Sequence, residues 1–595
     1  MKKSAAVRVV ILVLLGASAQ AQITSLASQD SGGIQGNNLS LGAAVSGDGR
    51  YVAFYSYATN LVPGDTNAAT DVFVRDRVTA TTERVSVATG GTEANSASTE
   101  SALSGNGRYV AFTSFASNLV PGDTNNSTDI FVRDRLLGTT ERVSVATGGA
   151  EGNQQSGSPA ISADGRFVAF HSFASNLVAG DTNGTNDIFV HDRQTATTER
   201  VSVDSGSLEA NGPSAWPALS ADGRYVTFIS YGSNLVVGDT NGVNDLFLRD
   251  RVAGTTERVS LPTGGGEADN ASGISSVSAD GRFVAFDSSA TNLVPGDING
   301  ALDVFVRDRQ TATTERVSVA TGGGEANDFS IRASMSDDGR FVTFQSQATN
   351  LVAGDTNGFV DIFLRDRANG TTSRVSVGTG SIEANGPSNY AATSRAGGFV
   401  AFESDASNLV FGDANAQTDV FAYDRDPSSF TSVCSPGANG VISCPCANPP
   451  SGSGRGCDNS SGTGGAILAA QGEAYLSADS LVFSTSAERA TATSILLQGT
   501  ATAASGIVYG QGVRCVAGTL KRLFTKIASG GSITAPDWSV FDPTVSSRSA
   551  AKGDVILAGQ SRWYLVYYRD PIVLGGCPAT STFNATQTGR VTWWP

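Results

Sequence analysis

The residues best suited to hold a cation lie in a loop that the chain repeats seven times, always 58 residues apart. The copies read DTNAATD, DTNNSTD, DTNGTND, DTNGVND, DINGALD, DTNGFVD and DANAQTD, so the first Asp, third Asn and seventh Asp never change. Several oxygen atoms from carboxylates, amides and backbone carbonyls bind Ca²⁺, and this spacing supplies them. The candidate metal ligands are Asp65, Asn67, Asp71, Asp123, Asn125, Asp129, Asp181, Asn183, Asp187, Asp239, Asn241, Asp245, Asp297, Asn299, Asp303, Asp355, Asn357, Asp361, Asp413, Asn415 and Asp419.

The same side chains can also stabilise a loop without any metal. Asp and Asn accept hydrogen bonds from nearby backbone N–H groups and so cap turns. The second Asp of each loop could instead pair with an Arg of a neighbouring strand. Residues that form the fold would recur as faithfully as ligands, so the sequence leaves calcium binding and turn capping both open.

Each 58-residue unit contains four stretches with the alternating pattern of β-strands. In one unit they are SPAIS (158–162), FVAFHS (167–172), DIFVHDR (187–193) and TTERVSV (197–203). An Asp-Gly-Arg turn joins the first two, and the Asp loop joins the second and third. Seven four-stranded units predict an all-β fold, a seven-bladed β-propeller in which neighbouring blades bury one another. A β-solenoid is the alternative, although its coils are usually shorter.

The start of the chain matches the end of a repeat, because GGIQGN (32–37) corresponds to GGTEAN (90–95). Residues 24–29 are therefore predicted to form an outer strand that completes the last blade and closes the ring. Residues 430–434 could take the same place.

The pattern SADGRFVAF…DIFVHDR…TERVS resembles the TolB-like, WD40-like (PD40) propeller repeats of exported bacterial proteins, over about residues 23 to 433. The resemblance implies the propeller fold and says little about activity. The Asp loop also resembles a shortened form of the D-x-N-G-D-G-x-x-D calcium loops of FG-GAP propellers. It lacks their central Asp-Gly pair and a terminal bidentate Glu.

Strand direction assigns the loops to faces. Strands alternate in direction within a blade, so the Asp loops and the blade-to-blade GGxEAN connections share one face. This face gathers Asp65, Asp71, Glu93 and their equivalents and is predicted to be strongly acidic. The Asp-Arg dipeptide that ends each third strand, such as Asp76-Arg77, is interpreted as structural, an ion-paired edge that orders the turn and the contacts between blades, because guanidinium and carboxylate groups pair bidentately.

Charge and the N-terminus indicate where the chain works. The formal net charge is −15, and no Lys occurs between residues 23 and 433, which argues against nucleic acid or anionic lipid as a partner. Residues 1–21 combine a basic start, a short apolar run and an Ala-Gln-Ala site, the pattern of a secretory signal peptide. We expect an exported monomer without a membrane span, in the periplasm, at the cell surface or outside the cell.

The repeat gives the domain boundaries. Residues 22–433 are predicted to form the propeller, 434–465 a Cys/Gly-rich linker or cap, and 466–595 a small β-sandwich-like domain. All six Cys residues lie in the last third and suggest disulfides of open connectivity. The C-terminal domain holds four Trp residues that could stack on sugars but more often fill a core: Trp538, Trp563, Trp593 and Trp594.

Nothing in the sequence points clearly to catalysis. Neither His171 nor His191 keeps its chemistry in the other repeats, and no G-x-S-x-G, H-E-x-x-H or P-loop motif is present. A propeller active site is usually a departure from the repeat, and the odd residues are Trp216, Phe329 and Arg332. The sequence predicts a non-enzymatic binding or scaffolding module with a protein or polysaccharide partner. The alternative is a secreted carbohydrate-active propeller, a lectin or a glycan-cleaving enzyme that uses carboxylates.

Overall fold

The computed structural model describes residues 23–77, 79–378, 381–425, 431–434, 436, 441, 443–444, 449–451, 455–471, 474, 481–509, 511–537, 542–557, 560–570 and 582–593. The predicted signal peptide lies outside the described residues. No helix in the described part of the chain is long and apolar enough to cross a membrane.

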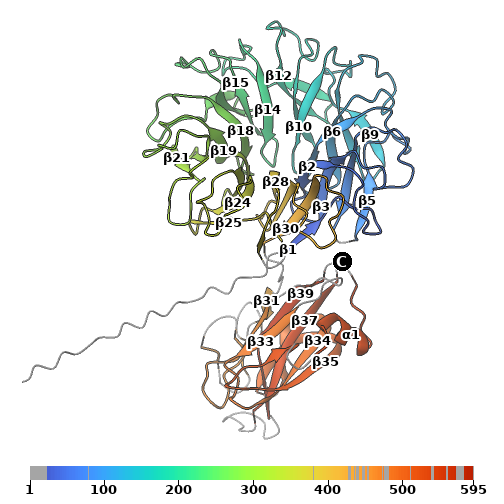
Figure 1. The fold of residues 1–595 in the computed structure, drawn as a ribbon, viewed down its shortest axis with the longest axis vertical. Helices are drawn as coiled ribbons and strands as arrows, with labels where there is room; N and C mark the ends of the chain where they lie inside the picture. The colour runs from blue at the N-terminus through green and yellow to red at the C-terminus, as the bar shows by residue number, and fades with distance from the viewer. Residues whose placement is uncertain are drawn as a thin grey trace, which may run out of the picture.

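Seven four-stranded antiparallel sheets form a ring, so the predicted seven-bladed propeller is confirmed (Figure 1). Six blades follow the chain, each running from its first to its fourth strand. Their strands are β2 (Ser40–Val45), β3 (Tyr51–Ser56), β4 (Asp71–Asp76) and β5 (Thr81–Arg84); β6 (Ser98–Leu103), β7 (Tyr109–Ser114), β8 (Asp129–Asp134) and β9 (Thr139–Arg142); β10 (Ser156–Ile161), β11 (Phe167–Ser172), β12 (Asp187–Asp192) and β13 (Thr197–Arg200); β14 (Ser214–Leu219), β15 (Tyr225–Ser230), β16 (Asp245–Asp250) and β17 (Thr255–Arg258); β18 (Ser272–Val277), β19 (Phe283–Ser288), β20 (Asp303–Asp308) and β21 (Thr313–Arg316); β22 (Ser330–Met335), β23 (Phe341–Ser346), β24 (Asp361–Asp366) and β25 (Thr371–Arg374). A two-stranded hairpin, β26 (Val377–Gly378) and β27 (Ile382–Glu383), follows blade 6.

The N-terminal strand closes the ring, as predicted. Blade 7 consists of β28 (Ser388–Thr393), β29 (Phe399–Ser404), β30 (Asp419–Asp424) and β1 (Ile23–Leu26). β1 pairs with β30, with Ile23 opposite Asp424. The alternative closing segment takes another role, because β31 (Thr431–Cys434) pairs with β39 (Thr588–Thr592) of the C-terminal domain.

The blades are held together by apolar side chains that lie between neighbouring sheets. The second and third strands of blade 1 each contribute a buried ring, Phe54 and Phe73, stacked with centroids 5.9 Å apart. Similar pairs occur in the other blades. Val72 and Val74 then pack with Phe112 of blade 2. Because these strands are covered on both sides, their sequences stay apolar through most of their length.

The Asp-Gly-Arg turn requires glycine. Gly165 has a φ of +77°, which favours a residue without a side chain. A Cβ added there would lie 2.1 Å from Cδ2 of Tyr109 in the preceding blade. The turn thus fixes the approach of two blades as well as the hairpin.

The C-terminal domain consists of two packed sheets and one short helix. Its larger sheet has the strand order β31-β39-β37-β34-β35, with β38 also pairing β37, and the smaller sheet has the order β32-β33-β36. The elements are β32 (Ile467–Gln471), β33 (Val482–Ser486), β34 (Thr493–Tyr509), β35 (Gly512–Ile527), β36 (Thr534–Ala535), α1 (Val545–Ala551), β37 (Ser561–Arg569), β38 (Phe583–Ala585) and β39 (Thr588–Thr592). Cys444 and Cys457 form a disulfide.

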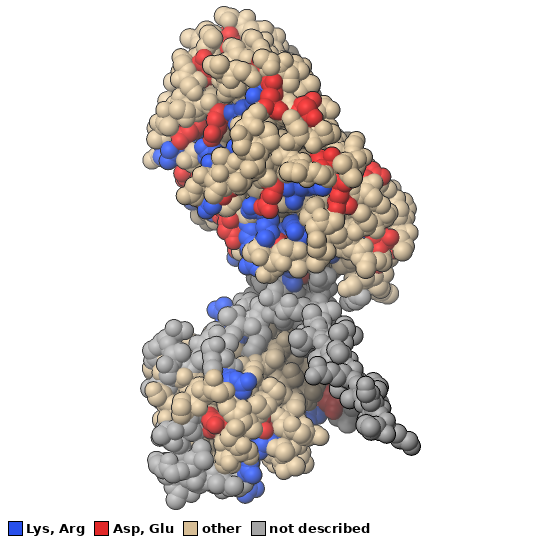
Figure 2. All heavy atoms as spheres, turned by 90° about the vertical axis from the view of Figure 1, so that its left-hand side faces the viewer, with Lys and Arg blue, Asp and Glu red and all other residues tan. Residues whose placement is uncertain are grey.

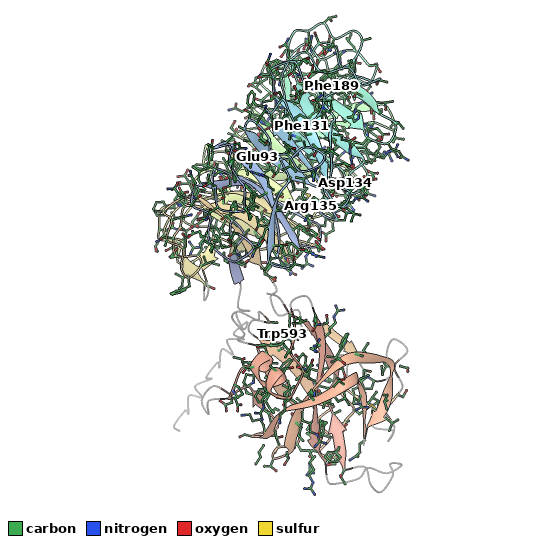
Figure 3. All side chains as sticks on the ribbon, turned by 90° about the vertical axis from the view of Figure 1, so that its right-hand side faces the viewer. Glu93, Phe131, Asp134, Arg135, Phe189 and Trp593 are labelled. Atoms are coloured by element: carbon green, nitrogen blue, oxygen red, sulfur yellow. A yellow bond between two sulfur atoms is a disulfide. The ribbon has the colours of Figure 1, made fainter. Side chains whose placement is uncertain are left out.

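Trp593 belongs to the core of this domain. Its side chain is fully buried, and its Nε1 donates to the Tyr564 hydroxyl at 3.1 Å. Tyr564 in turn packs on Phe483 of the smaller sheet, with ring centroids 4.5 Å apart. Trp593 therefore fills the sandwich core and is not available to stack on a sugar (Figure 3). Trp538 and Trp594 lie outside the described residues.

Candidate functional site: the acidic loops and the central channel

The acidic loops converge on an arginine. Carboxylate oxygens of Asp65, Asp71 and Glu93 lie within 4.8 Å of one another, a grouping that could hold a metal ion. Arg84 of β5 lies among them: its Nη1 is 3.5 Å from Asp65 and 3.2 Å from Asp71, and it also contacts Glu93. The guanidinium therefore already supplies a positive charge to this group. The equivalent arginines of the next five blades make the same contacts: Arg142, Arg200, Arg258, Arg316 and Arg374.

The remaining polar atoms of the loop are used by the protein. Asn67 donates its amide N–H groups to Asp71 Oδ2 and to Ala94 O, both at 3.0 Å, and its Oδ1 accepts from Ala69 N at 2.8 Å. Ser86 donates to the other oxygen of Asp71 at 2.5 Å. Asn67 thus acts as the turn cap that the sequence offered as the alternative to calcium binding, and it presents a donor, not an oxygen, to Asp71.

In blade 7, different residues contact the two Asp side chains of the loop. Leu26 stands at the position of Arg84, and Gln35 at the position of Glu93. Gln35 Nε2 donates to Asp413 Oδ1 and to Asp419 Oδ2, both at 2.7 Å. Blade 7 thus lacks both the Arg cation and the Glu anion of the other blades. The four residues of each copy therefore carry the same formal charge of −2. A donor between the two Asp side chains is the shared feature of all seven loops.

Burial perturbs these carboxyl groups. Burial raises the pKa of Asp65 to about 6, Asp71 adds to the rise, and Arg84 opposes it. Burial also acts to raise the pKa of Glu93, but hydrogen bonds from Thr66 and the charge of Arg84 leave it below its usual value. Four equivalents of Asp65 also have a pKa raised to about 6: Asp123, Asp181, Asp297 and Asp355.

The loop face is less acidic on its surface than the sequence predicts. The side chains of Asp65 and Asp71 are only 2% and 0% exposed, since each lies under the loop beside Arg84. On the surface of the propeller, acidic and basic side chains lie close together (Figure 2).

At the opposite face, Asp134 and Arg135 both take part in structural ion pairs, as predicted, but each with a different residue. Arg108 of the turn pairs with Asp134 at the end of β8 through two hydrogen bonds of 2.9 and 2.6 Å. Arg135 reaches the preceding blade, where it pairs with Glu83 at 2.6 Å and lies 4.3 Å above the Tyr51 ring. Figure 3 places Asp134 and Arg135 on one side of the propeller and Glu93 on the other.

A second candidate site is the central channel of the ring. A cavity of about 550 Å³ opens there among the first strands of all seven blades. Its lining includes one repeat position from every blade, the third residue of the first strand, and this position differs in every copy: Gly42, Glu100, Ser158, Trp216, Ile274, Arg332 and Tyr390.

The backbone is irregular at this position. In blade 2 the pairing of β6 with β7 shifts between Thr99 and Ala102, the mark of a β-bulge. Glu100 has a φ of +49°, and Trp216 and Arg332 have φ values of +50° and +58°. A non-glycine residue in this region costs about 1–3 kcal/mol. Bulges and such backbone conformations concentrate where a protein aims side chains at a ligand.

The bulge leaves the backbone N–H of the third residue of the first strand without a partner in the sheet. In several blades, a side chain of the preceding blade accepts a hydrogen bond from this N–H group. Glu403 Oε2 accepts from Gly42 N at 2.8 Å, and Gln345 Oε1 accepts from Tyr390 N at 3.0 Å. Glu100 Oε2 accepts from Ser158 N at 2.8 Å. The cavity wall is therefore fixed from one blade to the next around much of the ring.

The cavity combines aromatic, anionic and cationic groups. The guanidinium of Arg332 lies 3.9 Å from the centre of the Tyr390 ring. Burial raises the pKa of Glu403 to about 7 and that of Tyr55 to about 12. With Trp216 exposed by 46%, the cavity offers a flat apolar surface beside hydrogen-bonding groups.

The opposite end of the channel is narrow. Backbone hydrogen bonds join neighbouring blades there, from Gly47 N to Gly105 O at 2.8 Å and from Gly105 N to Ala163 O at 2.9 Å. Arg395 pairs with Asp337 at 3.3 Å and fills the space beside both glycines, because a Cβ added to Gly47 would lie 2.3 Å from its Cδ. The cavity described above therefore opens mainly toward the face of the acidic loops.

The sequence identified only part of this site. Trp216 and Arg332 were predicted as departures from the repeat, and both line the cavity, whereas Phe329 is not among the lining residues. The signal that would have found the others is the aligned repeat itself, in which this position differs in all seven copies. His171 is half-buried, and its buried Nδ1 has no hydrogen-bond partner among the described residues; partial burial lowers its pKa.

Comparisons with known proteins find only distant structural likenesses. No family model matches the chain, and no curated protein matches it. As the sequence pattern predicted, TolB is among the similar solved structures: TolB from Acinetobacter baumannii is 18% identical with a TM-score of 0.31, over 51% of this chain and 58% of TolB. An oligogalacturonate lyase from Vibrio parahaemolyticus is 11% identical with a TM-score of 0.39, over 68% of this chain and 91% of the lyase. Pyrococcus horikoshii acylaminoacyl peptidase is 11% identical with a TM-score of 0.39, over 62% and 49% of the two chains. Likenesses at this level carry no argument about activity.

Proposed function

We propose that this protein is an exported, non-enzymatic binding module whose specific ligand enters the central channel. The observation that carries the proposal is the divergence of one repeat position. The copies share most of their strand and turn residues, yet the third residue of the first strand differs in all seven blades and lines the cavity. Seven different residues build a single asymmetric site, which a symmetric structural role would not need. The volume, about 550 Å³, is in the range of small-molecule sites.

Trp216 provides the test. It is the only Trp of the predicted propeller, since the other four lie in the C-terminal domain. We expect a ligand to change the tryptophan fluorescence of the full chain, and Trp216→Ser to abolish both the change and the binding. Serine is the matched replacement because Ser158 occupies the same repeat position with a φ of +51°. A ligand that binds Trp216→Ser as tightly as the wild type would contradict the proposal.

For the acidic loops we propose a structural role, with Ca²⁺ binding as the alternative. Support comes from the arginine among the carboxylates and from Gln35, which takes over in blade 7. A Ca²⁺ ion would use Asp65, Asp71 and Glu93, but Asn67 presents its N–H groups there and the guanidinium competes for the same oxygens. In calorimetry on EDTA-stripped protein we expect no saturating heat and no rise in Tm. A stoichiometry near seven with a rising Tm would establish the alternative.

The proposal of export rests on the signal-like residues 1–21, and that of a monomer on the closed ring. Expression with and without residues 1–21, followed by fractionation, tests export. Sedimentation of the mature chain tests the monomer.

One observation favours a glycan-cleaving enzyme as the second candidate. Glu403 and Glu100 line the same cavity, and burial raises the pKa of Glu403 to about 7, which suits a general acid. Cleavage of a glycan panel that is lost in Glu403→Gln would establish this reading. If glycans bind but are not cleaved, the result supports the non-enzymatic binding module and not the enzyme.

A further inference from the structure

Four aromatic side chains are exposed on consecutive blades, on the face toward which the central channel opens. Tyr57, Phe115, Phe173 and Tyr231, which we call the aromatic crescent, occupy one repeat position directly after the second strand. Their exposed fractions are 49%, 59%, 37% and 58%. Blades 5 to 7 have polar residues at the same position: Ser289, Gln347 and Asp405.

The fold does not require aromatic residues there. The backbone N–H of Phe115 donates to Ala97 O at 2.9 Å, and that of Ser289 donates to Ala271 O at 3.0 Å, so the two backbones are held in the same way. Exposed aromatic rings at one repeat position of four consecutive blades form a row on one face, and apolar groups that gather on one face of a protein can mark an interaction surface. Because they stop after blade 4, the surface extends from the channel in one direction only.

The crescent lies at the end of the blades toward which the cavity opens, although its residues do not line the cavity. These residues follow the second strand at the end where the first strand begins, and the cavity is lined mainly by the third and fourth residues of the first strands. The opposite end of the channel is narrowed by Arg395. A ligand that fits this shape has one end in the cavity and a longer part over blades 1 to 4.

We propose that the ligand is a neutral, linear polysaccharide that places its chain end in the central cavity and stacks its following sugar rings on the aromatic crescent. The inference rests on the proposed binding role of the channel. Flat aromatic rings pack against the C–H faces of sugars, while Glu100, Glu403 and Arg332 offer acceptors and donors to the hydroxyl groups of the terminal unit. The chain has a formal net charge of −15 and no Lys from residue 23 to 433. Because like charges repel, it is not suited to bind a polyanionic polymer.

The experiment uses full-length mature protein and neutral oligosaccharides of two to eight units from several β- and α-linked glucans and xylans. We expect affinity to rise with chain length and then to level off. Phe115→Ser and Tyr231→Ser, which copy the serine of blade 5, should each weaken binding of the longest chain roughly 3- to 10-fold and leave the disaccharide unaffected. Trp216→Ser should weaken both. Val252→Ser, an exposed position after β16 on the opposite face, is the control and should change neither.

The outcomes separate this inference from the proposed function. If Trp216→Ser abolishes binding but the two crescent variants bind long chains normally, the crescent is not part of the site and the channel remains one. If the crescent variants weaken binding but Trp216→Ser does not, the chain end does not enter the channel, and both proposals fail. If the protein binds only charged polysaccharides, or binds a peptide and no glycan, the proposal of a neutral polysaccharide is wrong. Melting temperatures of all variants exclude misfolding as the cause.

Discussion

Blade 7 suggests a direct test of how the acidic loops are held. In blade 3, Arg200 Nη1 lies 3.4 Å from Asp187 and also contacts Glu209. Blade 7 replaces this Arg–Glu pair by Leu26 and Gln35. We predict that Arg200→Leu alone destabilises the propeller strongly, whereas Arg200→Leu combined with Glu209→Gln restores most of the stability, because it rebuilds the arrangement of blade 7.

The magnitude follows from burial. The side chains of Arg200 and Asp187 are 9% and 0% exposed, so removal of the guanidinium leaves the carboxylates without their cationic partner in a site of low solvent access. Breaking a buried ion pair by removing one partner costs about 3–5 kcal/mol. In the double variant the amide introduced by Glu209→Gln would donate to both Asp side chains, as Gln35 does at 2.7 Å, and we expect a net loss of about 1 kcal/mol or less.

The assay is urea unfolding of the full chain for wild type, both single variants and the double variant, read as the free energy of unfolding by linear extrapolation. The cycle isolates the coupling between the two positions. Glu209→Gln alone should cost less than Arg200→Leu alone. The reasoning is refuted if Arg200→Leu lies within about 1 kcal/mol of wild type, or if the double variant is no more stable than Arg200→Leu.

Two further predictions concern pH and the turns. Burial raises the folded-state pKa of Asp181 to about 6, so its stabilising contribution is fully present below its ordinary value near 4 and is lost as pH rises through about 6. We therefore expect Asp181→Asn to flatten the dependence of the urea midpoint on pH between about 4 and 6, and an unchanged slope would contradict the raised pKa. Gly165→Ala should destabilise by about 1–3 kcal/mol, because its Cβ would lie 2.1 Å from Tyr109 at a φ of +77°. Gly180→Ala, with a φ of +76° and no described atom within 4 Å of its Cβ, should cost about 1 kcal/mol and is the matched control in chemical denaturation; equal losses would refute the steric argument.

The sequence by itself determined the repeat, the number of blades and the order of strands, and it favoured closure of the ring by the N-terminal strand, which the structure then decided. It could do so because a 58-residue period with a glycine turn and alternating strands is local information, and because residues 32–37 visibly match the end of a repeat. The predicted fourth strand of blade 3, residues 197–203, was too long. It ends at Arg200, since the chain turns so that Ser202 can donate to Asp187 at 2.5 Å.

Only the tertiary structure decided what neutralises the acidic loops and where the specific site lies. The four residues lie far apart in the repeat: Asp65 is in a loop, Asp71 and Arg84 are at strand ends, and Glu93 is in a blade connection. The sequence does not say which of these side chains contact one another. The channel position was hidden for a different reason. A β-bulge breaks the alternation of the first strand at Glu100 and its equivalents, so a period of two could not assign their side chains to the channel. Strand patterns predict regular elements, and the site of this protein is built where the pattern is interrupted.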